Sequence, residues 1–438
     1  MTSAIINPRL DFFNKPPLNV TNKNYAVTVS DPTSIPVGEA PITFVIHSDA
    51  NFLNFQESLL KFKLKIVLEN GGDLTAPMSN HVGFVPNIFH SIFTMVRVRL
   101  NDHPVTPASD LYSYKAFIDT LFSKTQETTN LDMLSGGDFN VGGENEFGVD
   151  NNPSWLRRAA LCNLSALQEC SGQLAVDFLK CSRNILPNTK VEIVLFPQTA
   201  RFAIQRDANA AVANENFKYV IQDCQFMVRR EEICSTALLA METRLAKEMA
   251  SYYYPLGGVK PYNLAQGIFS YRADDIFNNQ LPIKLLVAFT RSTAFNGTYA
   301  SSPFYLNPTE EIEHVEFFKN GVRLGQQRTQ PINLAAEGTD IHVAYRELNK
   351  AVNGARGGAG LPYPASEFRL GLFFAALDLT PDGCDDMSHR YPTELGAVSI
   401  YVKFRNPLPH ALEMLVYGVF QEELNVNQSR AVITSVNI

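Results

Sequence analysis

The chain has 438 residues, of which 45% are hydrophobic, and a net charge of −7. A length like this allows two or three domains with a substantial core. The acidic balance argues against a protein built mainly to bind nucleic-acid phosphates, which requires a basic face. The 30 Phe and 16 Tyr, with only 18% charged residues, favour a sheet-rich protein with extensive buried or interfacial surface.

The cysteines are irregularly spaced and include no CxxC pair: Cys162, Cys170, Cys181, Cys224, Cys234 and Cys384. This spacing is untypical of a disulfide framework or a zinc site, and it favours reduced thiols in a protein synthesised inside the cell. The N-terminus lacks the basic start and apolar run of a signal peptide, so we expect no secretion. No stretch reaches about 18 consecutive apolar residues, so we expect no membrane-spanning helix.

The first 40 residues are rich in Asn, Pro, Thr and Ser and show little periodicity. We interpret residues 1–40 as an extended arm that contacts neighbouring subunits or inner components. An edge strand near Tyr25–Val29 is the alternative interpretation.

A strand with one buried face is predicted at Leu60–Leu68, where apolar residues alternate with Lys61, Lys63 and Lys65. Such a lysine stripe could face nucleic acid. A solvated or inter-subunit sheet face is the preferred interpretation, because exposed charge on a sheet is common.

The stretch from Gly83 to Phe122 contains the clearest local patterns. Apolar residues alternate with arginines over Val96–Leu100, as in a half-buried strand. Asn101-Asp102 then supplies residues that favour a turn. Apolar residues over Leu111–Phe122 are spaced as one helical stripe, which predicts a helix.

Periodicity disappears from Ser123 to Ser171, which predicts a long surface loop. Strands are predicted again at Gly172–Phe178, Lys190–Leu195 and Phe217–Val228. Glu231–Ala250 has the composition of a helix and connects the two halves of the chain.

Four strand patterns recur in the second half in the same order. Leu60–Ile66 matches Ile283–Phe289, Val96–Asn101 matches Val315–Asn320, Leu174–Phe178 matches Val398–Val402, and Val191–Leu195 matches Leu412–Val416, at offsets of 223, 219, 224 and 221. A nearly constant offset predicts a duplicated domain of about 200 residues.

These patterns predict an all-β fold of two tandem eight-stranded jelly-roll sandwiches, a double jelly roll, with short helices in the loops and the linker. The predicted divisions are an arm at 1–40, a first jelly roll at 41–235 with its long surface loop at about 123–171, a helical linker at 236–250, and a second jelly roll at 251–438.

No catalytic, cofactor-binding or metal-binding residues are predicted. The eight histidines are dispersed, without an HxH or HExxH motif. The chain also lacks a GxSxG elbow and a P-loop. Asp382-Gly-Cys-Asp-Asp386 is interpreted as a turn rather than a cation site. We therefore expect a protein that is not an enzyme.

Three segments of the chain resemble a known family: NFQESLLKFKLKIVLENG (54–71), VPNIFHSIFTMVRVRLNDHPV (85–105) and LYSYKAFIDTL (111–121). They are similar to the first half of the double jelly-roll major capsid proteins encoded by Polinton (Maverick) transposons and adintoviruses. Residues 281–321 are similar to the second half of the same proteins. Residues 123–171 and the glycine tract at 354–360 show no such likeness.

The resemblance implies a homotrimeric, pseudo-hexagonal capsomer that builds an icosahedral shell around double-stranded DNA, without sequence-specific DNA binding. It also implies a penton or minor capsid protein as a partner, and a location in the virion. The alternative is a carbohydrate-binding or carbohydrate-active tandem jelly roll. That alternative needs exposed aromatic residues, and Trp155 is the only tryptophan in the sequence.

Overall fold

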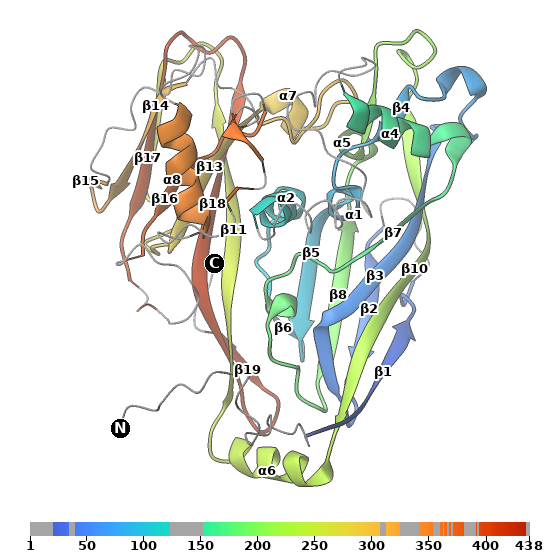
Figure 1. Ribbon diagram of the computed structural model, residues 1–438, viewed down its shortest axis with the longest axis vertical. Helices are drawn as coiled ribbons and strands as arrows, with labels where there is room; N and C mark the ends of the chain where they lie inside the picture. The colour runs from blue at the N-terminus through green and yellow to red at the C-terminus, as the bar shows by residue number, and fades with distance from the viewer. Residues whose placement is uncertain are drawn as a thin grey trace, which may run out of the picture.

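The chain folds into two β-sandwiches that stand side by side along the long axis of the molecule (Figure 1). The computed structural model describes residues 21–34, 40–122, 152–306, 312–324, 341–353, most of 360–380, and 391 and 394–434. The named strands of these residues pair antiparallel throughout. The fold is therefore the predicted all-β double jelly roll.

The first sandwich consists of two four-stranded sheets. One sheet has the order β1 (Asn22–Ser30), β10 (Phe217–Ile233), β3 (Phe52–Leu68) and β7 (Gln168–Gly172). The other has the order β2 (Ile42–His47), β8 (Lys190–Pro197), β5 (Phe93–Leu100) and β6 (His103–Pro104). A separate pair, β4 (Val82–Phe84) and β9 (Ile204–Arg206), lies at the end opposite β1.

The second sandwich repeats this arrangement. One sheet has the order β11 (Ala250–Leu264), β18 (Leu412–Val426), β13 (Lys284–Arg291) and β16 (Ala375–Asp378), with β19 (Val432–Thr434) also paired to β18. The other has the order β12 (Ser270–Ala273), β17 (Val398–Phe404), β14 (Ile312–Lys319) and β15 (Val322–Arg323). Each half of the chain thus supplies two sheets with the same succession of strands.

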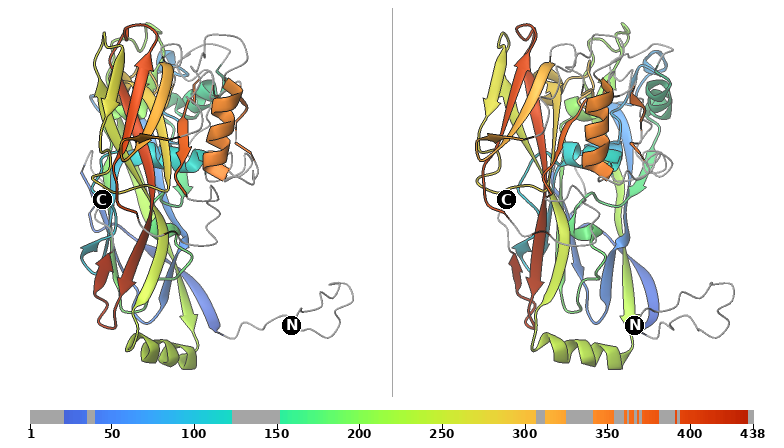
Figure 2. Two further views of the ribbon diagram at one scale, coloured as in Figure 1. Left: turned by 90° about the vertical axis from the view of Figure 1, so that its left-hand side faces the viewer. Right: turned by 60° about the vertical axis from the view of Figure 1, so that its left-hand side comes forward.

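The helices lie in the connections between strands. They are α1 (Ile88–Ser91), α2 (Tyr112–Phe122), α4 (Pro153–Leu161), α5 (Ala200–Ala203), α6 (Ser235–Leu245), α7 (Ser292–Phe295) and α8 (Ile341–Asn353), with short 3-10 turns at Ala76–Met78, Asn163–Ser165 and Phe178–Lys180. In Figures 1 and 2, α6 lies at one end of the molecule and joins the long strands β10 and β11. The predicted helix in the first half is confirmed at α2.

Strand position confirms two of the four predicted repeats and shows that the other two are wrong. β3 and β13 lie next to the long strands β10 and β18, and β5 and β14 each begin a hairpin. The strand β17 corresponds to β8, however, and not to residues 174–178. Likewise β18 corresponds to β10 and not to β8. In both wrong matches, the segment chosen in the first half precedes the strand that occupies the equivalent position. Short alternating patterns look alike, so the sequence does not distinguish neighbouring strands.

The predicted strand at Gly172–Phe178 is wrong beyond Gly172, where β7 ends. Side chains of α2, rather than a neighbouring strand, bind the backbone of this segment. The Ala175 amide donates to the Tyr112 hydroxyl (3.1 Å), and Lys115 Nζ donates to the Ala175 carbonyl (3.2 Å). Because both polar groups of Ala175 are bound in this way, the segment cannot continue a ladder.

The predicted loop at 123–171 contains regular structure in its second part, where α4, a 3-10 turn and β7 occur. The Asn152 side chain accepts a hydrogen bond from the Trp155 amide (2.9 Å), which caps the start of α4, and Pro153 occupies the first turn. Trp155 is completely buried. The first part of the predicted loop, 123–151, lies outside the described residues, as do residues 1–20, 354–359 and 381–390.

Two element boundaries also differ from the predictions. Asn22–Ser30 form β1 at the edge of a sheet, which matches the alternative of an edge strand instead of an arm. The predicted helix at Glu231–Ala250 is shorter, because β10 continues to Ile233 and β11 starts at Ala250. Glu231 is buried within β10, and its carboxylate accepts hydrogen bonds from the side-chain amides of Asn54 (2.8 Å) and Asn184 (2.7 Å).

Each half contains the same asparagine hairpin. Asn101 and Asn320 have positive φ angles of 47° and 52°, and each follows the hairpin's first strand. The Asn101 amide donates to the Lys190 carbonyl (2.9 Å), and the Lys190 amide donates to Asn101 Oδ1 (2.7 Å). Asn320 exchanges the same two bonds with Ala397, at 2.8 and 2.9 Å. The repeat is therefore preserved down to individual hydrogen bonds.

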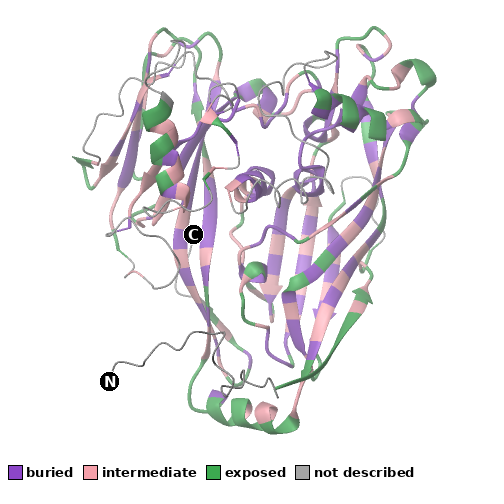
Figure 3. Cartoon of the chain, viewed as in Figure 1, coloured by how far each residue is buried: buried purple, intermediate pink, exposed green. Residues whose placement is uncertain are grey.

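Alternation along the strands places the core between the sheets (Figure 3). The apolar residues of β3 that alternate with lysines, Leu60, Phe62, Leu64 and Ile66, have no exposed surface. The predicted buried face of this strand is thus confirmed. Buried residues from both sandwiches form one continuous apolar core, so each sandwich is stabilised partly by the other.

We expect Asn101→Ala and Asn320→Ala each to lower the free energy of unfolding by about 1–3 kcal/mol. Each substitution removes a hydrogen bond of the asparagine side chain, and each places alanine at a positive φ angle, which alanine rarely adopts. Asn101→Ala should cost more, since Asn101 Nδ2 also donates to the Arg430 carbonyl (2.7 Å). Urea unfolding followed by the fluorescence of Trp155 would measure both. Asn101→Gly loses the same side-chain hydrogen bonds as Asn101→Ala but relieves the strain at positive φ, so this matched control should cost less than Asn101→Ala. Wild-type stability in both Ala variants would contradict the role of the hairpins.

Candidate assembly surface

The described residues contain no group of three or more His, Cys, Asp or Glu placed to hold a metal ion. Two histidines of the first sandwich have local polar contacts instead. His81 Nδ1 lies 2.6 Å from Asp207 Oδ2, and His90 Nδ1 lies 2.9 Å from the Tyr112 hydroxyl. Among the described helices, none has the length and apolar character needed to cross a membrane.

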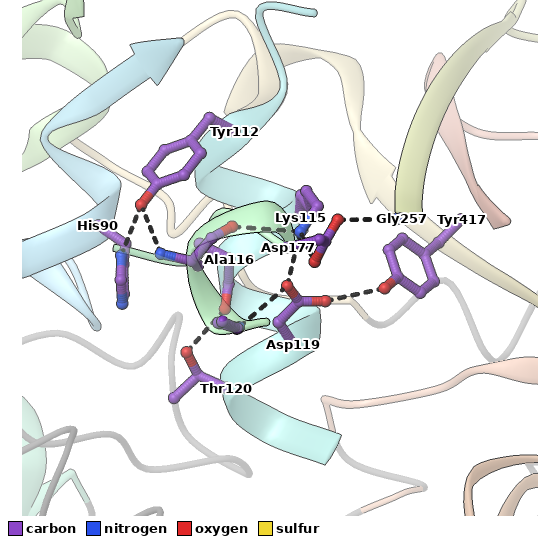
Figure 4. Close-up of polar contacts among 11 residues, drawn as sticks. His90, Tyr112, Lys115, Ala116, Asp119, Thr120, Asp177, Gly257 and Tyr417 are labelled. Carbon is purple, nitrogen blue, oxygen red and sulfur yellow. Dashed lines mark hydrogen bonds and ion pairs between the residues drawn. The ribbon is translucent and has the colours of Figure 1, made fainter. Parts of the chain in front are cut away.

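A cluster of charged side chains that are only 9–13% exposed lies where the two sandwiches meet (Figure 4). On α2, Lys115 Nζ lies 2.7 Å from Asp119 and 2.9 Å from Asp177. Two hydrogen bonds come from the second sandwich: the Tyr417 hydroxyl donates to Asp119 (2.8 Å), and the Gly257 amide donates to Asp177 (2.9 Å). The cluster therefore connects α2 to both β11 and β18.

Burial and the neighbouring charges shift the pKa values of Lys115 and Asp119 in opposite directions. Burial by itself would lower the pKa of Lys115, but Asp119 and Asp177 more than offset it and raise that pKa above its ordinary value. Burial would raise the pKa of Asp119, yet Lys115 and Lys180 bring it down to about 2. The pKa of Asp177 is raised, by burial first and by the neighbouring Asp119. The cluster thus contains a stable ammonium–carboxylate pair, as expected of a structural junction.

Close packing requires glycine at one position of this junction. A β-carbon on Gly257 would lie 2.6 Å from the Tyr417 hydroxyl. That separation is shorter than any ordinary contact, so a side chain here would push Tyr417 away from Asp119.

Aromatic rings fill the rest of the junction. Phe117 of α2 stacks on Phe304 with ring centroids 4.6 Å apart, and Phe122 meets Phe374 at 5.0 Å. Tyr114 stacks on Phe295 at 5.6 Å. Such pairs each contribute about 0.5–1.5 kcal/mol beyond their buried area. No sequence pattern indicates these aromatic partners directly, whereas the spacing of Lys115 and Asp119 at i and i+4 is typical of an ion pair on one helix.

The lysine stripe of β3 is neutralised by acids of the first sandwich. Lys61 lies 3.0 Å from Glu169, Lys63 lies 2.7 Å from Asp223, and Lys65 lies 3.0 Å from Asp73. A phosphate backbone would have to displace these partners. This pairing agrees with the preferred interpretation of a solvated or inter-subunit sheet face.

Large apolar side chains are nevertheless exposed at several places on the surface. On β1, Tyr25, Val27 and Val29 are 59%, 56% and 56% exposed. Other exposed side chains are Leu161, Leu164 and Leu167 near α4, Leu239 on α6, and Val322 and Leu395 on the far side of the second sandwich. β1 is also a sheet edge, since in the described residues it pairs only with β10. An apolar strand at a free edge favours contact with another chain.

We expect Lys115→Met to lower the free energy of unfolding by about 3–5 kcal/mol, because it removes the cation that lies between two largely buried carboxylates and leaves only Lys180, 3.4 Å from Asp119. Tyr417→Phe should cost about 1–3 kcal/mol by removing one donor to Asp119. Lys61→Met, which breaks an exposed ion pair of the same type, is the matched control and should cost less than about 1 kcal/mol. Equal urea midpoints for Lys115→Met and Lys61→Met would contradict the role of the cluster.

Acid should weaken the junction. The depressed pKa of Asp119 means that its ionised form stabilises the fold fully above its unfolded pKa of about 3.9, and that this contribution is lost as pH falls toward about 2. We expect wild-type protein to lose stability more steeply than Asp119→Asn between about pH 4 and pH 2. The free energy of unfolding of both proteins, measured across this pH range, would test the expected direction. If the two free energies changed in parallel with pH, the role assigned to Asp119 would be refuted.

No protein-family model matches the chain. An uncharacterized protein of Caenorhabditis elegans, F54H12.2, is 21% identical over 407 residues, which cover 90% of this chain and 92% of that protein.

Solved structures resemble the chain over its whole length. The Sputnik virophage structure matches with a TM-score of 0.67 and 13% identity, covering 100% of this chain and 94% of the other. The mavirus major capsid protein matches at 0.59 and 10% (100% and 96% covered), and the Faustovirus major capsid protein at 0.59 and 10% (97% and 93% covered). The mavirus and Faustovirus structures are those of major capsid proteins. The chain has the double jelly-roll fold of viral major capsid proteins.

Proposed function

We propose that this chain is a major capsid protein of the Polinton (Maverick) and adintovirus type. The observation that carries the proposal is the succession of two jelly rolls along the whole chain, which matches capsid proteins from end to end. The sequence resemblance at 54–71, 85–105, 111–121 and 281–321 supports the particular type.

Three copies form a homotrimeric capsomer with a pseudo-hexagonal outline. The physical argument is that three copies of two similar sandwiches give six similar units around a closed axis, and closed symmetry satisfies every copy of the interface. The matching hydrogen bonds of Asn101 and Asn320 support the similarity of the two units. The exposed apolar residues of β1 support burial of this surface between copies.

The capsomers build an icosahedral shell that encloses double-stranded DNA and forms the virion capsid. A net charge of −7 and the paired lysines of β3 support enclosure without sequence-specific binding. A penton or minor capsid protein fills the five-fold vertices, where a pseudo-hexagonal unit does not fit. The five described cysteines are free thiols, which supports synthesis inside the cell.

Light scattering coupled to size-exclusion chromatography should give the purified chain about three times the mass of one chain. Obligate interfaces of this kind commonly bury more than about 2,000 Å², so the trimer should stay associated during the measurement. Negative-stain images should show pseudo-hexagonal particles. A well-folded monomer at micromolar concentration would refute the proposal.

Val27 provides a variant that separates assembly from folding. Val27→Lys adds a charge to a side chain that is already 56% exposed, so the melting temperature should change little. The same charge buried between copies should shift the chain toward monomer. Val27→Thr, which keeps the shape of the side chain, should leave assembly intact. Full assembly of Val27→Lys would exclude this strand from the interface.

A further inference from the structure

A cavity of about 280 Å³ lies between the two sandwiches, beside the buried charge cluster. Residues 105–109, the start of α2 and residues 175–178 line it from the first sandwich. Residues 256–260 of β11 and Phe277 line it from the second. Lys115, Asp177 and Gly257, which belong to this lining, are labelled in Figure 4. Both halves of the chain are therefore needed to form the cavity.

Most of the lining is apolar. Val96 and Val105 of the first sandwich and Leu256, Val259 and Phe277 of the second all line the cavity and are buried. A hydrocarbon chain that enters such a cavity leaves water, and each CH₂ group that it buries tightens binding about fourfold. The lining therefore favours a ligand with an apolar body.

Three of the lining residues are charged, and two of them neutralise each other. Lys115 Nζ lies 2.9 Å from Asp177 Oδ1, and the Gly257 amide donates to Asp177 Oδ2 (2.9 Å). Among the uncharged lining groups, Thr106 Oγ1 already accepts a hydrogen bond from the Val98 amide (3.0 Å). Asp177, the one carboxylate of the lining, thus has both oxygens bound within the protein.

The third charged residue, Lys260, has no acid partner. Its half-buried side chain places Nζ 2.9 Å from the Ile276 carbonyl, to which it donates, and 5.4 Å from the centroid of the Phe277 ring. No acid of the described residues forms an ion pair with this ammonium. Because an ammonium has three N–H donors, two remain to bind a ligand. A cation at the edge of an apolar cavity favours an anionic group there, since charge-assisted hydrogen bonds are among the strong ones.

We propose that this cavity binds an amphipathic carboxylate, a fatty acid of medium chain length. The carboxylate binds Lys260 Nζ, and the hydrocarbon chain lies against the apolar lining. The volume of about 280 Å³ is close to the lower end of the range for ligand pockets, about 300–1,000 Å³, which favours a medium chain over a long one. The inference is independent of the capsid function, because the cavity lies within one chain.

Three probes with the same eight-carbon chain test the chemistry of the site: octanoate, octan-1-ol and octyltrimethylammonium. Titration calorimetry on the full chain should show saturable binding of octanoate, at least tenfold tighter than octan-1-ol and tighter still than the cation. Hexanoate should bind more weakly than octanoate, by about fourfold for each missing CH₂ group. The absence of saturable octanoate binding, or octan-1-ol binding as tightly as octanoate, would overturn the proposal.

Two lysine substitutions serve as a matched pair. Lys260→Met removes the ammonium and keeps the length of the side chain, so octanoate should bind at least tenfold more weakly while octan-1-ol changes less than twofold. Lys284 is also half-buried, and its Nζ donates to the Val352 carbonyl (3.2 Å), but it does not line the cavity. Lys284→Met should leave octanoate binding unchanged. Melting temperatures would verify that both variants are folded, and equal losses of octanoate binding would overturn the role of Lys260.

A substitution at the edge of the cavity tests where the hydrocarbon chain lies. Ala108 lines the cavity but is exposed, so Ala108→Trp can fill part of the cavity without disturbing the core. Octanoate and octan-1-ol should both bind at least tenfold more weakly to this variant, and Ala108→Ser, the control, should bind both as the wild type does. An octanoate with a photoreactive diazirine at its far end should crosslink to residues 105–111 or 256–260, as located by peptide mass spectrometry. Crosslinks confined to other segments, or unchanged binding to Ala108→Trp, would overturn the assignment of the cavity.

Discussion

The buried ion pair between Lys115 and Asp119 is the interaction on which the arrangement of the two sandwiches depends. It lies on α2, which belongs to the first sandwich by sequence but is covered by the second. Largely buried carboxylates, here bound by the ammonium groups of Lys115 and Lys180, are unstable unless their polar atoms find partners. The Tyr417 hydroxyl and the Gly257 amide supply partners from the second sandwich. Separating the sandwiches would therefore expose the aromatic rings and leave these charges without their hydrogen bonds.

Duplication explains why one chain forms two sandwiches with the same order of strands. The same order of strands is produced twice, and each hairpin turns at an asparagine that adopts a positive φ and fixes the following strand. The two copies have since diverged in their surroundings. Asn101 also binds the Arg430 carbonyl and so contacts the second sandwich, whereas Val322 and Leu395, beside the hairpin of Asn320, are exposed. The two hairpins therefore make the same backbone hydrogen bonds in different surroundings.

The surface of the molecule is consistent with a protein that assembles. Charged side chains of β3 are paired with local acids, so little free positive charge remains on that face. Apolar side chains on β1, by contrast, are exposed along a free sheet edge. A free apolar edge is a liability for a monomer, and a closed assembly removes it.

The sequence by itself determined the elements whose signal is local. Alternation identified the buried face of β3, helical spacing identified α2, and the turn residues Asn101 and Asn320 marked the repeated hairpins, because each pattern depends only on neighbouring residues. Tertiary structure decided the rest. Residues 174–178 have strand-like alternation, yet side chains of α2 bind their backbone, and Asn22–Ser30 become a strand only because β10 extends to pair with them. The junction cluster joins residues as distant as Asp119 and Tyr417, and no local pattern specifies a partner nearly 300 positions away.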